Sequence, residues 1–498
     1  MSPTTTPAPA NDPNVVQTIA TQTASGHQVC NVTLTRDADK RTKELLCDSP
    51  YVIPVIFVPG VMGTNLKKKN SSRVKVWRPP NGTPDGIKTL AEYFFKKAPA
   101  DRQILFDPKN AEVDKDGPIN PGATGLSAVV LKERGWGSVH MDSYGEILRT
   151  LHHTLNNLYT QSGPVGAAPT DEFMYHMLED PALWGSVSRS TKLTKADLKA
   201  MGCYRAVPDS GRERVLGVIH GVQPSVGAPS AYTRMRAGFE GVLSGVLGVN
   251  AIEAVPELAN SPAALEMLPF ATYNDGKPWL STTDPKHLSL PKTGNPFAEI
   301  YACAAWYGLI PEQNIKLIDP AGTVAKRIGP DKSIRENFTD ALVDARSFQN
   351  AITNYGYHPQ THVYCCVEQT RKTWGQVCWN GHIRSDVRDI KSCVMSEDSL
   401  TGSIRLAIGA PLNPLAPKWD SVAHATLALS SPDQAGDGTV PAYSGLAPHG
   451  KQWVQSMFVH GHGSARGYEH QLSYADERAQ WVTVYGIVQL TKLADWAA

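Results

Sequence analysis

The stretch Tyr51–Leu66 reads YVIPVIFVPGVMGTNL, and the interpretation of the whole sequence starts from it. Residues 52–58 are apolar and rich in β-branched side chains, and Pro59 and Gly60 follow them. Such a run predicts a strand that is buried on both faces, as in a parallel sheet. The glycines at positions 60 and 63 then allow a sharp turn. The stretch is either a plain strand with a turn, or a strand end whose backbone N–H groups stabilise a developing oxyanion.

Three more apolar runs, at 215–221, 362–367 and 454–460, predict further buried strands. Apolar residues at helical spacing predict helices over 145–158 and 474–493. Strands that alternate with helices in this way predict an α/β fold with a mostly parallel sheet.

Residues 230–350 are helical in character and predict a helical cap inserted into the sheet-forming core. Within them, 238–258 is the most apolar helix candidate, either as the core of the cap or as a lipid-facing surface. Residues 159–214, in contrast, contain no run of four strongly apolar residues and predict no buried strand. The expected organisation is a polar N-terminal extension, a first part of the core, the cap and a second part of the core, over 1–50, 51–229, 230–355 and 356–498.

The composition excludes several classes of protein. The 498 residues carry 48 Lys and Arg against 47 Asp and Glu, so the charge gives no reason to expect a nucleic-acid partner. No run of 18 apolar residues and no signal peptide are visible, which predicts cytoplasmic synthesis and leaves specialised secretion open. No phosphate-binding or dinucleotide glycine motif occurs, so no cofactor is expected. The oligomeric state is not indicated.

Two polar motifs follow predicted strands, and the acidic motif precedes the histidine motif along the chain. Asp437 lies in Gly-Asp-Gly-Thr-Val-Pro at 436–441, and His470 ends Gly-Tyr-Glu-His at 467–470, after the strand predicted over 454–460. An acid followed by a histidine, each on a loop after a strand, suits the last two members of a nucleophile–acid–histidine triad. His470 would move the proton, and Asp437 would hold the imidazole tautomer. Taken singly, a turn aspartate and a core histidine explain the two residues equally well.

Together, VIFVPGVMGTNL, GDGTVP and GYEH resemble the α/β-hydrolase branch that includes the lecithin:cholesterol acyltransferase group and bacterial lipase-like proteins. VLGVIHGVQPSVGAPSAYTRMRAG, from position 215, also resembles the strand and helix that follow the nucleophile helix in bacterial members. The resemblance implies an α/β-hydrolase-like fold and hydrolysis of lipid-like esters, with contact to a membrane surface. It implies that Asp437 is the acid, that His470 is the base, and that Val61 and Met62 form the oxyanion hole. Some bacterial relatives are antibacterial phospholipase effectors delivered by contractile secretion machinery.

The sequence departs from this family at the nucleophile, because it contains no G-x-S-x-G. The motif is expected before the 215–221 strand, where about two βα units are missing. Ser225 has glycine at +2 but glutamine at −2, and no apolar strand precedes Ser143, Ser186 or Ser188. The nucleophile is therefore unknown. We expect an impaired serine-type ester hydrolase; the alternatives are an inactive binding protein with a hydrolase fold and the product of a truncated gene.

For the remaining histidines and cysteines, the sequence predicts structural roles. His460 and His462 lack a third metal ligand at suitable spacing, so no metal site is predicted. His152 and His153 are expected on a polar helix face. Cys365 and Cys366 are expected in the core. Mostly free thiols are expected, although Cys30 could pair with Cys47, and two of Cys365, Cys366, Cys378 and Cys393 could pair.

Overall fold

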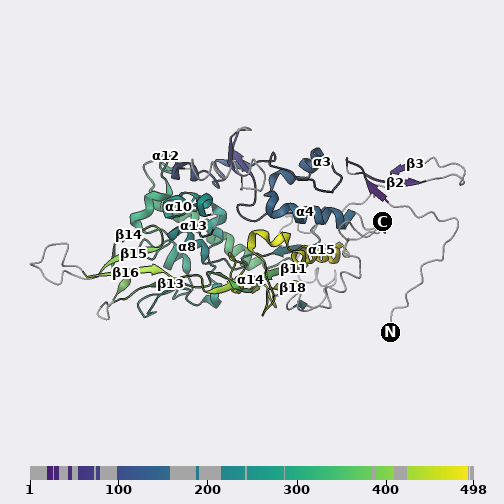
Figure 1. Cartoon of the computed structure of the whole chain (residues 1–498). Coiled ribbons are helices and arrows are strands. Elements are labelled where there is room, and N and C mark those ends of the chain that lie inside the picture. Colours follow the sequence, from purple (N-terminus) through teal and green to yellow (C-terminus); the bar gives the residue numbers. More distant parts are fainter. Residues whose placement is uncertain are drawn as a thin grey trace, which may run out of the picture.

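The computed structural model shows a mixed α/β protein (Figure 1). The residues that it describes are 20–25, 27–32, 43–46, 54–71, 74–78, 98–156, 187–189, 215–241, 244–284, 286–383, 387, 389–408, 423–491 and 493. None of the helices within these ranges is long and apolar enough to cross a bilayer.

The sheet that positions the candidate site has four strands in the order β7-β18-β11-β8. Strands β8 (Val218–Gly221), β11 (Thr361–Cys366) and β18 (Val454–His460) are parallel, and β7 (Val187–Arg189) pairs antiparallel with β18. All six side chains of β11 are buried, as expected for a strand between two neighbours and two layers. Parallel strands end at the same edge, so the loops after β11 and β18 lie close together.

Helices cover both faces of this sheet. On one face, Tyr364 and Cys366 of β11 pack with Trp481 of α15 (Glu477–Thr491). Helix α4 (Met141–Asn156) lies beside α15, through Ile147 and Val484 (Figure 1). On the other face, alternate residues of β11 pack against the short helix α14 (Ala442–Leu446). The helices predicted over 145–158 and 474–493 and the strands predicted over 215–221, 362–367 and 454–460 are therefore confirmed, with ends shifted by up to four residues.

The strand predicted over 52–58 is wrong for the residues that the structure describes. Residues 54–60 have no regular structure, and Val55, Ile56 and Val58 are 46%, 82% and 78% exposed. A strand is stable only beside hydrogen-bonded neighbours, and no described strand pairs with this run. Its apolar sequence nevertheless brings Phe57 into the cluster that also contains Ile219 of β8. Phe57 therefore packs against α4 and α15, the helices that cover one face of the four-stranded sheet. Strand β7, within 159–214, is a short strand that the sequence did not predict.

A second, six-stranded sheet was not predicted. Its order is β10-β9-β13-β16-β15-β14, with bounds Ser289–Leu290, Leu280–Thr282, Val377–Asn380, Ala423–Leu429, Ser403–Ile408 and Val394–Asp398. The ribbon of β12 (Glu368–Thr373) and β17 (Gln434–Gly436) carries the chain from β11 into this sheet and back to the acid loop. One hydrophobic core joins the sheet to the helices of the predicted cap (Figure 1). The cap is thus part of a larger mixed α/β lobe, and the predicted domain boundaries remain a prediction.

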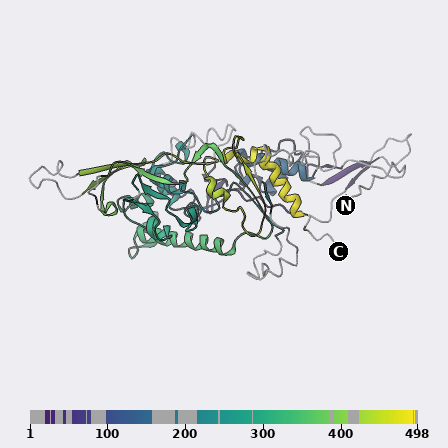
Figure 2. The same ribbon diagram turned by 90° about the horizontal axis from the view of Figure 1, so that it is seen from below.

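The helices of this lobe pack apolar faces against the second sheet. Residues 238–258 form two helices in place of one, because the chain breaks at Gly248, whose φ is +112°. Ala254, Val255 and Leu258 of the second helix are buried, which supports the cap-core interpretation of this stretch. The long helix α13 runs along the outside (Figure 2). The helices are α8 (Ser230–Ala237), α9 (Ser244–Leu247), α10 (Ala251–Leu258), α11 (Pro262–Glu266), η3 (Tyr273–Gly276), η4 (Phe297–Tyr301), η5 (Glu312–Ile318), α12 (Thr323–Ile328), α13 (Ile334–Tyr355) and η6 (Ile390–Ser392).

Small elements complete the N-terminal part. The predicted polar extension contains a three-stranded antiparallel sheet of β1 (Ala20–Gln22), β2 (Gln28–Val32) and β3 (Lys43–Leu46). A second sheet contains β4 (Leu66–Lys68), β5 (Lys75–Trp77) and β6 (Ala111–Val113). The short helices are α2 (Pro99–Arg102), α3 (Ala128–Glu133) and η1 (Trp136–Ser138).

Trp379 of β13 lies at the centre of the larger core. Its side chain is fully buried, its Nε1 donates to the Tyr232 hydroxyl at 3.2 Å, and the Arg236 guanidinium lies 5.1 Å from its ring. We expect Trp379→Ala to lower the free energy of unfolding by about 3–5 kcal/mol, because it leaves a large cavity. Urea unfolding measures this loss. The exposed Val343 provides the control V343A, and equal stabilities of the two variants would contradict the predicted core.

Candidate active site

Asp437 is buried in the loop between β17 and α14, with 1% of its surface exposed. Its Oδ1 accepts hydrogen bonds from the backbone N–H groups of Thr439 at 2.9 Å and Val440 at 2.7 Å. The loop needs its glycines. Gly438 has a φ of +88°, and a Cβ on Gly436 would lie 2.2 Å from the carbonyl oxygen of Val440. The backbone thus holds one carboxylate oxygen and leaves the other for a partner.

That partner is His470, the first residue of η7 (His470–Ala475). Its Nδ1 lies 2.7 Å from Oδ2 of Asp437, and its backbone N–H donates to the carbonyl oxygen of Asp437 at 3.0 Å. The side chain is 29% exposed, so the ring is reachable from outside. No described residue forms a hydrogen bond with Nε2 of His470. The pair therefore has the geometry in which an aspartate orients a histidine and leaves Nε2 to move a proton.

The surroundings of His470 change its affinity for protons. Burial of the ring lowers its pKa, but the charge of Asp437, the hydrogen bond to that carboxylate and the charge of Glu469 raise it. Arg234 acts in the other direction and lowers it. The net result is a pKa above the ordinary value of 6.5. A histidine stabilised as imidazolium is suited to accept a proton during a reaction.

The turn at residues 60–63 holds the candidate oxyanion donors. The N–H of Gly63 donates to the carbonyl oxygen of Gly60 at 3.0 Å, and Met62 has a φ of +65°. Trp77 donates to the carbonyl oxygen of Met62 at 2.7 Å and fixes the turn. The backbone N–H groups of Val61 and Met62 donate to no described residue. The turn therefore leaves two backbone N–H groups without a described acceptor, and their role as oxyanion donors remains a prediction.

Aromatic contacts connect this turn to the helix that begins at His470. The Tyr144 hydroxyl accepts a hydrogen bond from the N–H of Gly60 at 3.1 Å. The Tyr144 ring lies 5.6 Å from that of Tyr474, and the Phe57 ring lies 5.4 Å from Tyr474. Tyr474 belongs to η7. The structure therefore brings together Asp437 and His470, and it holds the Val61–Met62 turn against the same helix.

None of the described candidate serines forms a hydrogen bond with His470. Ser225 Oγ donates to the carbonyl oxygen of Gln223 at 3.4 Å and also contacts Tyr357. Ser143 is buried in the first turn of α4, where its hydroxyl pairs with Nδ1 of His140 at 2.8 Å. Ser188 lies in β7, opposite Met457. Ser186 lies outside the described residues.

The other reactive side chains are parts of the core. Cys365 and Cys366 are buried thiols in β11, and burial raises the pKa of both. The pairing considered among Cys365, Cys366, Cys378 and Cys393 is wrong, because all four are free thiols. Cys47 lies outside the described residues, so its pairing with Cys30 remains a prediction.

Of the other candidate histidines, His460 and His152 are buried and His462 is exposed. His460 is buried, with Nδ1 2.7 Å from the Tyr468 hydroxyl, and His462 is exposed. His152 does not lie on a polar face as expected. It is buried, and its Nε2 is 3.2 Å from the carbonyl oxygen of Thr124, because α4 packs against that loop. His153 is half-buried. The described residues contain no group of three or more potential metal ligands.

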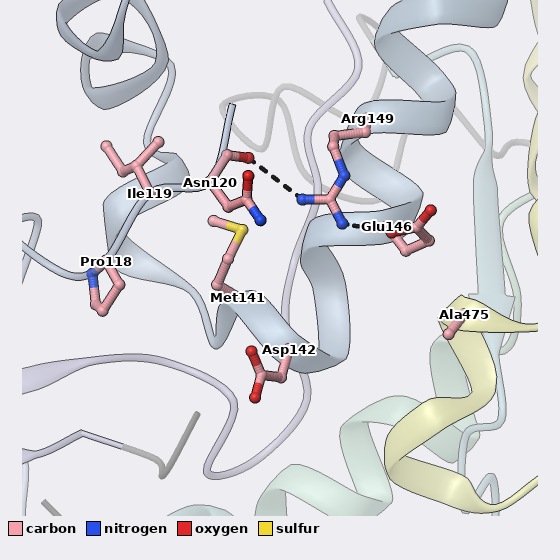
Figure 3. A pocket seen from close by; sticks show the side chains of 8 residues that line it. All are labelled: Pro118, Ile119, Asn120, Met141, Asp142, Glu146, Arg149 and Ala475. Carbon is pink, nitrogen blue, oxygen red and sulfur yellow. Dashed lines mark hydrogen bonds and ion pairs between the residues drawn. The ribbon is translucent and has the colours of Figure 1, made fainter. Parts of the chain in front are cut away.

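A cavity of about 400 Å³ lies between α4, the loop at 118–120 and Ala475 of η7 (Figure 3), and neither Asp437 nor His470 lines it. Its charged residues already have partners, since Arg149 forms an ion pair with Glu146 and donates to the carbonyl oxygen of Asn120 at 3.3 Å. It is lined by Pro118, Ile119, Asn120, Met141, Asp142, Glu146, Arg149 and Ala475. It reaches η7 only through Ala475.

Two charged neighbours of His470 were not predicted. Glu469 is adjacent in sequence, and Arg234 lies in α8. A single arginine in a helix carries no sequence signal, because only the fold places α8 against the acid loop. The Ser230 hydroxyl at the start of α8 donates to the carbonyl oxygen of Thr439 at 3.4 Å.

No protein-family model and no curated protein match this chain. The chain is similar to a chain in the crystal structure of the Tle4–Tli4 complex, with 28% sequence identity and a TM-score of 0.67. The similarity covers 88% of this chain and 98% of that chain. Together with the parallel order of β8, β11 and β18, this likeness supports an α/β-hydrolase-like fold for the mixed α/β architecture.

Proposed function

We propose that this chain is a lipase-type carboxylic ester hydrolase of reduced activity, with Asp437 as the acid and His470 as the base. The observation that carries the proposal is the 2.7 Å contact between Nδ1 of His470 and Oδ2 of Asp437, at the carboxyl edge of the parallel strands. The resemblance of VIFVPGVMGTNL, GDGTVP and GYEH to lipase-like hydrolases gives the chemistry. The 28% identity over most of the chain supports the fold.

The proposed reaction proceeds through an acyl-enzyme and needs no cofactor. His470 takes the proton of a serine hydroxyl through Nε2, and the serine oxygen attacks the ester carbonyl carbon. The N–H groups of Val61 and Met62 stabilise the resulting oxyanion. The alcohol leaves with the proton from His470. Water then attacks the acyl group, again with His470 as base, and releases the carboxylic acid and the serine.

The nucleophile is the unassigned part of this proposal. The sequence lacks G-x-S-x-G, and no described serine forms a hydrogen bond with His470. Activity below that of a complete triad is therefore part of the proposal.

A lipid-like ester is the proposed substrate. Leu472, two residues after His470, is 54% exposed, and Val61 is 40% exposed. Exposed apolar side chains beside a reaction centre favour contact with a lipid surface. The similar structure is a complex, so we also propose that this chain binds a protein partner. Because some of the bacterial proteins that the sequence resembles are exported effectors, we further propose export by a specialised route.

Release of fatty acid from phospholipid vesicles and from tributyrin tests the proposal. We expect carboxylic acid to appear above the buffer rate, and we expect the rate to be unaffected by a metal chelator. Correctly folded protein that releases no acid from either substrate would contradict the proposed hydrolase.

A second candidate is a binding protein that keeps the fold and has lost catalysis. The observation that favours it is the exposure of Val55, Ile56 and Val58, which would be interior positions if a strand lay beside them. This candidate predicts ester binding without acid release.

A further inference from the structure

Two arginines in α8 have opposite surroundings. Nη1 of Arg236 donates to the carbonyl oxygens of Trp306 and Gly308 at 2.6 and 2.7 Å, and its Nη2 forms an ion pair with Asp398 at 3.6 Å but no hydrogen bond. The guanidinium of Arg234, two residues earlier in α8, forms no hydrogen bond and no ion pair with any described residue. Its side chain is half-buried, so its donors are removed from part of their water.

The position of Arg234 is fixed by the protein around it. Its guanidinium lies over the ring of Phe239, with 5.0 Å between the central carbon and the ring centroid. The start of α8 is held against the acid loop through Ser230 and Thr439. Ser230 and Arg234 are four residues apart in α8, so both lie on the face of the helix that is turned toward the acid loop. The cation therefore lies on the side of α8 that faces the acid loop, and its charge lowers the pKa of His470.

The carboxylates near Arg234 do not neutralise it. Asp437 already uses its oxygens for His470 and for two backbone N–H groups. Glu240 is exposed and interacts with Arg234 only through charge, without an ion pair. Burial lowers the pKa of Arg234, and the charges of Glu240 and Asp437 act in the opposite direction. A planar guanidinium with free donors is suited to bind a phosphate or carboxylate through two hydrogen bonds.

We propose that Arg234 binds the phosphate of a phospholipid head group and thereby selects phospholipids over uncharged glycerides for the site at His470. This inference rests on the proposed function for the identity of the site, but it concerns recognition and not hydrolysis. Arg234 would hold the head group while the acyl ester lies at Nε2 of His470. Arg236, tied to the carbonyl oxygens of the neighbouring loop, takes no part.

Binding of short-chain lipids to the full chain tests this assignment without any catalytic step. The probes are dihexanoylphosphatidylglycerol below its micelle concentration, the uncharged dihexanoylglycerol with the same acyl chains, and inorganic phosphate. We expect Arg234→Gln to weaken phosphatidylglycerol binding about 10- to 100-fold in calorimetry, the usual loss for a charge-assisted hydrogen-bond pair. Binding of dihexanoylglycerol should stay unchanged. The control R405Q removes an exposed arginine of β15 and should bind both lipids normally.

Two further measurements distinguish a lipid head group from free phosphate and distinguish loss of the contact from misfolding. If the phospholipid binds more tightly than inorganic phosphate and both depend on Arg234, the lipid head group is supported. Inorganic phosphate binding as tightly as the phospholipid would overturn the lipid assignment. Arg234→Lys keeps the charge but not the two-pronged geometry, so it should fall between wild type and R234Q. Equal binding of phosphatidylglycerol by wild type and both variants would overturn the proposal. A failed hydrolysis assay with intact, Arg234-dependent binding would reject only the proposed function.

Discussion

Replacement of His470 by alanine is expected to lower the rate of ester hydrolysis by about 10⁴-fold, the upper end of what a general base contributes. The variant removes the only described side chain that donates a hydrogen bond to the buried Oδ2 of Asp437. It also removes the nitrogen that would take the nucleophile's proton. Substrate affinity should change little, because His470 acts on the reacting atoms. Initial rates with a p-nitrophenyl ester measure the effect.

His462 provides a matched control. It lies on the loop between β18 and η7, is exposed, and has no place in the proposed mechanism. His462→Ala should hydrolyse the ester at the wild-type rate. A loss of less than tenfold in His470→Ala would show that hydrolysis does not pass through His470.

The second large effect is expected for Asp437→Asn, with a loss of about 10²- to 10⁴-fold in kcat. The upper value, about 10⁴-fold, is the loss of kcat that a wrong imidazole tautomer causes in a complete serine triad. The asparagine keeps the size of the side chain but removes the charge that lies 2.7 Å from Nδ1 of His470. Asp331, an exposed residue before α13, provides the control D331N, which should keep full activity.

The same variant should change the protonation of His470. Burial and Arg234 lower the pKa of His470, and Asp437 outweighs them in the wild type. Without the carboxylate charge, we expect this pKa to fall, which an NMR titration of the imidazole measures. The raised pKa stabilises the folded wild type fully below pH 6.5, and this contribution disappears as the pH rises through the folded-state value. Asp437→Asn should lose this acid-side stabilisation. An unchanged pKa would contradict the contact.

The parts of the fold that the sequence predicts are those whose pattern is local. β11 and β18 are short runs of mostly buried side chains, and each has a neighbouring strand on both sides. The run at 52–58 has the same composition, yet its described residues form no strand, because a strand also needs a pairing partner. The six-stranded sheet was missed since strands such as β14, Val394–Asp398, carry mostly exposed polar side chains.

In the candidate site, too, some residues could be predicted from the sequence and others could not. The order of Asp437 and His470 along the chain predicts a pair, and the structure brings their side chains into contact. Arg234 could not be found from sequence, because its importance depends on the packing of α8 against the acid loop. Gly438 is an intermediate case. A glycine beside an acid predicts a tight loop, and its φ of +88° agrees.

Labelling with a fluorophosphonate probe, followed by peptide mass spectrometry, tests the central claim most directly. The probe reacts with a serine only when a neighbouring base activates it. For the folded chain we predict modification of a single serine, which also identifies the nucleophile. We predict that His470→Ala abolishes this modification and that His462→Ala does not. A folded wild-type chain in which no serine is modified, or in which labelling is indifferent to His470, would contradict the account.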